Sequence, residues 1–135
     1  MPPPIWVINL ARSTERRAYI TAHLEALGLP FEIAPAVDGR ELTPEELAEV
    51  YDPVQAIAAI GREMSPSEIG CALSHLRLYQ RMATENIDTA LIIEDDASIH
   101  ADLPGLLARR AGFPADWELL LLYHDGYQFK TGQQQ

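Results

Sequence analysis

The spacing of apolar and polar positions changes several times along this chain, which predicts that strands and helices alternate. Residues 5–10 (IWVINL) and 90–93 (ALII) are short runs rich in strand-forming side chains, as in buried strands of a parallel sheet. We expect the first of these runs near the middle of the sheet. Residues 31–34 alternate apolar and polar positions, which is typical of a shorter strand. Residues 117–123 (WELLLLY) predict one more buried strand.

Start and stop signals predict helices between these strands. Ser13 or Thr14 is a natural N-cap for a first helix. Capping boxes at residues 43–46 and 65–68, each with proline at the first helical position, predict a short helix to about residue 50 and a long one to about residue 85. Gly28 and Pro30 predict the end of the first helix, and residues 102–104 predict the start of another that ends near Gly112. Residues 52–61 suit either a helix or a mobile loop.

The long helix that begins after Ser65 has a predicted face for the sheet. At about 100° per residue, Ile69, Leu73 and Leu76 form one apolar stripe that should pack on the sheet. Arg77 and Arg81 are then expected to point into solvent. Gly70 lowers the helix propensity of the first turn, which suggests that another part of the chain or a ligand approaches the backbone closely there.

Strands that alternate with helices predict the α/β class, with a mostly parallel sheet flanked by helices. The 135 residues are enough for one small domain with one core. We therefore expect a single domain over residues 1–135, in which residues 124–135 form an irregular tail.

Charge and composition narrow the classes of function. Twenty Asp and Glu against ten Lys and Arg give a net charge of -10, which opposes binding to nucleic acid because phosphate backbones need a basic surface. The single cysteine, Cys71, excludes an internal disulfide and favours a reducing compartment. No apolar stretch approaches the length of a membrane span, and the N-terminus lacks a signal peptide's charged and apolar regions. We expect a cytoplasmic protein, at most peripheral to the inner face of the membrane.

Three consecutive carboxylates follow the apolar run at 90–93. Glu94, Asp95 and Asp96 come where that predicted strand leaves the core, and in open α/β sheets ligands bind outside the carboxyl ends of the strands. Adjacent acids repel one another, and a divalent cation that takes oxygen ligands would compensate them. A solvated acidic turn is the alternative, and we rank the metal interpretation ahead of it.

Other polar side chains follow the first strand and line the long helix. Asn9, at a strand end, suits a turn cap or a ligand contact, and the nearby arginines suit a phosphate at a helix N-terminus, although no glycine-rich loop accompanies them. Glu68 and His75 lie two turns apart on the flank of the long helix. Cys71, between them, is most simply a small buried apolar residue, with nothing to suggest a lowered thiol pKa.

Three segments together resemble glycosyltransferase family 25, the lipopolysaccharide-biosynthesis glycosyltransferases related to collagen galactosyltransferases. They are residues 8–10 with Arg12 and Arg16, residues 65–75 (SPSEIGCALSH), and residues 92–96 (IIEDD). The resemblance implies a GT-A-like, nucleotide-sugar-binding fold. It also implies metal-dependent transfer of a hexose, typically from a UDP-hexose, to a saccharide acceptor in lipopolysaccharide or glycan biosynthesis.

The resemblance also implies roles for particular residues. The last segment resembles the family's metal motif, in which Mn²⁺ or Mg²⁺ is held against the donor diphosphate. The implied set is Glu94 and Asp96 as metal ligands, Asn9, Arg12, Arg16, Ser74 and Asp95 near the nucleotide, and Glu68 and His75 in proton transfer or in shaping the donor pocket.

Plainer interpretations stand beside these roles. His75 suits a hydrogen-bonded packing residue, Glu68 the acid of its own capping box, and Ser74 a hydroxyl bonded to the carbonyl one turn earlier. Family members continue well beyond the end of this sequence, so it resembles their donor-binding half. A non-catalytic remnant that binds nucleotide or a partner chain, with self-association through exposed apolar surface, is therefore the alternative function. A receiver-like signalling domain ranks lower, because its acidic pair would follow the first strand.

Overall fold

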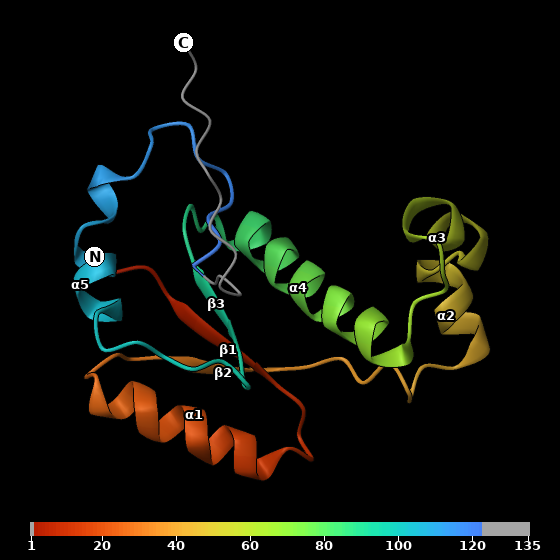
Figure 1. Ribbon diagram of the computed structural model, residues 1–135, viewed down its shortest axis with the longest axis horizontal. Coiled ribbons are helices and arrows are strands. Elements are labelled where there is room, and N and C mark those ends of the chain that lie inside the picture. The colour runs from red at the N-terminus through yellow and green to blue at the C-terminus, as the bar shows by residue number, and fades with distance from the viewer. Residues whose placement is uncertain (1, 123–135) are drawn as a thin grey trace.

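The computed structural model of the chain describes residues 2–122 and confirms the α/β class (Figure 1). Strands and helices alternate along the chain, as the hydrophobic spacing predicts. In order, the elements are β1 (Ile5–Asn9), α1 (Thr14–Ala26), β2 (Glu32–Pro35), α2 (Pro44–Val50), α3 (Pro53–Ile60), α4 (Pro66–Glu85), β3 (Leu91–Glu94), α5 (Leu103–Ala108) and the 3₁₀ turn η1 (Arg110–Gly112).

Within the described residues the sheet is entirely parallel, with the strand order β2-β1-β3. The central strand is β1, as predicted, and all five of its residues are buried. Trp6 is aligned with Glu32 of β2 on one side and with Ile92 of β3 on the other. Parallel alignment brings the carboxyl ends of all these strands to one edge of the sheet, where ligands bind in folds of this class.

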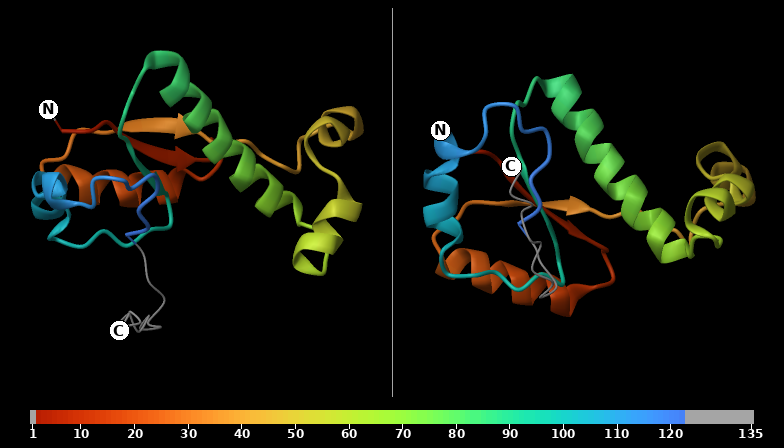
Figure 2. Two further views of the ribbon diagram at one scale, coloured as in Figure 1. Left: turned by 90° about the horizontal axis from the view of Figure 1, so that it is seen from above. Right: turned by 45° about the horizontal axis from the view of Figure 1, so that its top comes forward.

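Successive side chains of β1 enter two separate cores. Ile5 and Val7 pack with Ile20 and Leu24 of α1, whereas Trp6 packs with residues of α4 on the opposite face. The helices α1 and α4 accordingly lie on opposite sides of the sheet (Figure 2). A strand covered on both faces reads as a continuous apolar run, which is why β1 is recognisable in the sequence.

The helix α4 meets the sheet through a different stripe from the one predicted. Its buried residues are Ile69, Gly70, Ser74 and Leu78, whereas Leu76 is 46% exposed. Two of the buried positions are small or polar, so apolar periodicity alone misplaced the stripe. The buried stripe follows the contact of α4 with the segment after β2 and with Trp6, which is a tertiary effect.

Arg81 does not point into solvent as predicted. Its guanidinium lies 4.7 Å from the centre of the Trp6 ring and pairs with Glu32 of β2 at 2.9 Å and with Glu85 at 3.1 Å. The aromatic face and two carboxylates together draw the cation onto the β2 side of the sheet.

Both capping boxes occur as predicted, and the ambiguous segment at 52–61 is helical. The side chains of Thr43 and Ser65 cap α2 and α4, and Asp52 caps α3 by accepting hydrogen bonds from backbone N–H groups. Neither α2 nor α3 has a buried residue, and both stand away from the sheet (Figure 1).

The prediction of a buried strand at 117–123 is wrong over residues 117–122. These residues form no strand, and Leu119 and Leu121 are 70% and 78% exposed. An apolar run becomes a buried strand only if it pairs with a sheet edge and is covered, and this run does neither. Tyr123 and the predicted tail at 124–135 lie outside the described residues. In the described part of the chain, no helix has the length and apolar character needed to span a bilayer.

Candidate functional site

The three consecutive acids after the β3 apolar run do not point the same way. Glu94 is aligned with Ile8, whose side chain belongs to the α4 face. Ile93 belongs to the α1 face, and Asp95 contacts Asn9 at that side of the tip of β1. Because side chains alternate across a strand, the acids are divided between the two faces of the sheet.

Asn9, Arg16 and Asp95 form the first group, here called the Asn9 cluster. The Asn9 amide donates from Nδ2 to Asp95 Oδ2 at 2.7 Å and to the Ser13 carbonyl at 3.1 Å, and Arg16 Nη1 lies 3.6 Å from Asp95 Oδ1. Asn9 and Asp95 are 2% and 8% exposed. Arg16 therefore places a positive charge beside Asp95, the middle acid of the three. Asn9 Oδ1 is buried without a hydrogen-bond partner among the described residues.

Cys71, His75 and Glu94 form the second group, here called the Cys71 cluster. The thiol donates to Glu94 Oε1 at 2.8 Å, and His75 Nε2 lies 3.5 Å from the same oxygen. Partial burial raises the pKa of the Cys71 thiol to about 11, helped by the hydrogen bond to Glu94 and the negative charges of Glu94 and Asp96. Asp96 is exposed and makes no hydrogen bond or ion pair with the part of the chain that is described.

The prediction that Cys71 is a buried apolar residue is wrong. Its side chain is exposed and faces the tip of β3. The reason is the orientation of α4, whose buried stripe runs through Gly70, Ser74 and Leu78. Residues one position further along, Cys71 and His75, then lie on the flank that meets Glu94. No signal in the sequence around Cys71 alone places it there.

Ser74 holds the scaffold of the site together. Its Oγ donates to the Gly70 carbonyl at 2.7 Å, which is the local bond foreseen as an alternative, and accepts from the Val37 N–H at 2.9 Å. A Cβ on Gly70 would lie 2.6 Å from the Val37 carbonyl oxygen, so the close approach predicted at Gly70 is confirmed. The segment that follows β2 thus lies directly against α4.

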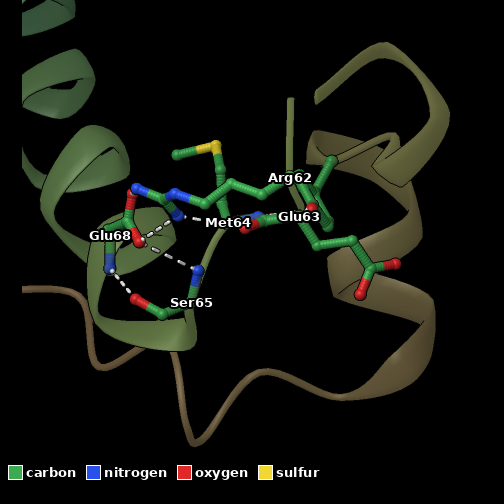
Figure 3. Close-up of polar contacts among 6 residues, drawn as sticks. Arg62, Glu63, Met64, Ser65 and Glu68 are labelled. Carbon is green, nitrogen blue, oxygen red and sulfur yellow. Dashed lines mark hydrogen bonds and ion pairs between the residues drawn. The ribbon is translucent and has the colours of Figure 1, made fainter. Parts of the chain in front are cut away.

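Glu68 is held at the start of α4 by contacts of its own (Figure 3). Its carboxylate takes two hydrogen bonds from Arg62, at 2.8 and 3.0 Å, and closes the capping box with Ser65. The Arg62 guanidinium, followed by the Ser65 backbone N–H, lowers the pKa of Glu68 to about 2. The structure does not bring Glu68 into contact with His75. Arg62 was not singled out from the sequence, because a loop arginine six residues before an acid carries no distinctive pattern.

Arg12 links the two loops at the carboxyl edge of the sheet. Its guanidinium pairs with Asp38, which also accepts a hydrogen bond from the Arg40 backbone N–H at 3.1 Å. The ion pair joins the loop after β1 to the loop after β2, so it fixes the edge from which Asn9 projects.

A pocket of about 260 Å³ opens between α4 and the side of the sheet formed by β1 and β2, from Glu32 to Pro35. Its wall includes Ser74, Arg77 and Arg81 from α4 and Pro35 from the end of β2. The carboxyl edge of the sheet therefore combines Arg12 with the Asn9 and Cys71 clusters, each of which contains one carboxylate. This chemistry suits an anionic ligand with a cation.

Comparison with known proteins gives a match over nearly the whole chain. A family model described as glycosyltransferase family 25 (LPS biosynthesis protein) matches residues 2–133. Similar proteins are a glycosyltransferase 25 family member of Anopheles gambiae (36% identical; 86% of this chain, 21% of the relative), the inactive glycosyltransferase 25 family member 3 of Homo sapiens (29%; 78% and 18%) and the procollagen galactosyltransferase 1 of Danio rerio (27%; 87% and 21%). The chain spans about a fifth of the length of these curated relatives.

Proposed function

This chain belongs to glycosyltransferase family 25, and we propose that it binds the nucleotide-sugar donor in the metal-dependent transfer of a hexose to a saccharide acceptor. The proposed donor is a UDP-hexose and the proposed metal is Mn²⁺ or Mg²⁺. The observation that carries the proposal is the position of two carboxylates, Asp95 in the Asn9 cluster and Glu94 in the Cys71 cluster, at the carboxyl edge of a parallel sheet beside the end of the central strand.

The carboxylates at this edge suit the proposed metal. Asp95 is already paired with Arg16 and Asn9, which leaves Glu94 and the exposed Asp96 as oxygen ligands. A metal ion bound there would act as a Lewis acid that neutralises negative charge on the departing nucleoside diphosphate. In the proposed site, His75 Nε2 lies 3.5 Å from the Glu94 carboxylate.

The Asn9 cluster suits the nucleotide. The Arg16 side chain is 61% exposed, and within residues 2–122 its ion pair is the contact of 3.6 Å with Asp95. Its other N–H groups are therefore placed to donate to phosphate oxygens. The unpartnered Asn9 Oδ1 is an acceptor that a donor group of the ligand would satisfy. Arg12 and Ser74 contribute less directly in this proposal, because each is bonded to the protein's own loops.

The acceptor and the sugar are further parts of the proposal. The family description names lipopolysaccharide biosynthesis, which supports a saccharide acceptor. The zebrafish relative is named as a procollagen galactosyltransferase, which makes UDP-galactose the first donor to assay.

The proposal is tested by calorimetric titration of the protein with UDP, with and without Mn²⁺. We expect metal-dependent binding that Asp96→Ala weakens by at least about tenfold, since a contact to a charged ligand is worth on the order of 1.5–3 kcal/mol. Asp88→Ala is the matched control, because Asp88 is an exposed acid just before the opposite end of β3. Equal affinity in the presence and absence of metal would contradict the proposal.

A second function is favoured by one comparison. The human relative is named as inactive, and it matches 78% of this chain. The alternative is a non-catalytic protein that binds nucleotide or a partner chain. An assay of UDP release from UDP-hexoses separates the two functions. The transferase cleaves its donor and releases UDP, whereas the non-catalytic alternative leaves the UDP-hexose intact.

A further inference from the structure

The Cys71 cluster brings three different ligand atoms to one point. The Cys71 sulfur, a His75 ring nitrogen and a Glu94 carboxylate oxygen all lie within 4.8 Å of one another. In a tetrahedral zinc site, with metal–ligand distances of about 2.0–2.3 Å, ligand atoms lie roughly 3.3–3.8 Å apart. The separation of 3.5 Å between His75 Nε2 and Glu94 Oε1 already falls in that range.

The backbone that carries these ligands is well fixed. Cys71 and His75 are four residues apart on the 20-residue helix α4, so their side chains project from the same face in successive turns. The third ligand, Glu94, ends strand β3, which is hydrogen-bonded to the central strand. Close contact at Gly70 and the Ser74–Val37 hydrogen bond anchor the same end of α4. The three side chains therefore need only rotamer adjustments to converge on an ion.

We propose that Cys71, His75 and Glu94 bind Zn²⁺, with the fourth coordination position left open to water or a ligand. Thiolate, imidazole and carboxylate form a borderline-soft set, which favours Zn²⁺ over Mn²⁺ and excludes a preference for Mg²⁺, an ion that takes oxygen ligands. The thiol proton that now bonds Glu94 is released to solvent when the sulfur binds the metal. The exposed carboxylate of Asp96 adds negative charge beside the site.

This site extends beyond the proposed donor chemistry and does not require it. Glu94 is the shared residue, because it belongs both to the proposed donor-metal pair with Asp96 and to the Cys71 cluster. Zn²⁺ held by the sulfur and the imidazole therefore competes with a donor metal for that carboxylate. The consequence is that added Zn²⁺ would inhibit donor binding rather than support it.

The test is a titration of the full chain, freed of metal, with Co²⁺ followed by Zn²⁺. We expect a thiolate-to-cobalt charge-transfer band in the near ultraviolet that Zn²⁺ abolishes by displacement. Calorimetry with ZnCl₂ should show affinity reduced at least tenfold in Cys71→Ser and in His75→Gln. His100→Gln is the matched control, because His100 is exposed and lies outside the cluster, and it should leave the affinity unchanged.

The variants separate this proposal from the donor proposal. Asp96→Asn should retain Zn²⁺ binding while it loses metal-dependent UDP binding. Absence of the charge-transfer band, or full Zn²⁺ affinity in Cys71→Ser, overturns the zinc site and leaves the donor proposal standing. Circular dichroism of each variant checks its fold, and none of the substituted side chains belongs to the buried core.

Discussion

At the scale of single residues, the environment of Cys71 determines how the thiol reacts. With a pKa of about 11, against an ordinary value of 9.0, roughly one thiol in a thousand is ionised at pH 8. We expect slow alkylation by iodoacetamide in the metal-free protein, with a rate that still rises above pH 10. Replacing Glu94 by Gln removes the charge and should speed the reaction several-fold at pH 8, which mass spectrometry of the alkylated chain measures.

The matched control for that experiment is Asp88→Asn, which removes an acid at the far end of the same strand. It should leave the alkylation rate unchanged. A rate that reaches half its maximum near pH 8.5 in the unaltered protein would contradict the contact between Cys71 and Glu94.

The Arg62–Glu68 ion pair makes the stability of the fold depend on pH in the acidic range. The pKa of Glu68 is about 2 in the folded chain and near 4.5 without its partners, so the stabilisation is fully present above about pH 4.5 and is lost as the pH falls toward 2. Arg62→Met should raise the pKa of Glu68 and flatten that dependence. Carboxyl-carbon NMR titration of Glu68 in both proteins measures the pKa directly, and identical titration curves would refute the ion pair.

At the scale of elements, the seating of α4 depends on Gly70. Alanine there would place a Cβ 2.6 Å from the Val37 carbonyl oxygen, and backbone must move to make room. We expect Gly70→Ala to destabilise the fold by about 1–3 kcal/mol, although alanine is the better helix former by about 1 kcal/mol. Urea unfolding measures the difference. Gly112→Ala is the control, since its Cβ would meet nothing within 4 Å, and it should be near neutral.

Elements whose signals are local were predictable from the sequence, and those set by distant contacts were not. The capping boxes at Thr43 and Ser65 predict where α2 and α4 begin, because a capping box involves only four consecutive residues. The orientation of α4 depends on Val37, which is 37 positions from its partner Ser74, so periodicity within the helix misplaced it. Residues 117–122 failed as a strand for the same reason, because pairing is a property of the sheet edge.

At the scale of the whole molecule, parallel topology explains how much of the candidate site could be predicted. Only the family resemblance grouped Asn9, Arg16 and Asp95, which the structure shows in contact. The rule that ligands gather at the carboxyl edge placed the acids after β3 at that edge. This rule did not predict that Glu94 and Asp95 lie on opposite faces of the sheet, because the face depends on how each side chain is oriented along β3. The position of Cys71 in the site follows from the orientation of α4, which the sequence alone did not predict. The expected self-association stays a prediction, and the structure adds Leu119 and Leu121 as exposed apolar side chains.

The alignment of β3 with β1 also determines which side chains each acid contacts. A slip of one residue along that ladder would turn Glu94 to the α1 face of the sheet, where Arg16 lies, and Asp95 to the α4 face. A single residue inserted into β3 before Glu94 would therefore take this carboxylate away from Cys71 and His75 while preserving every side chain involved. The position of each acid along β3 thus determines its chemistry as much as its residue type does.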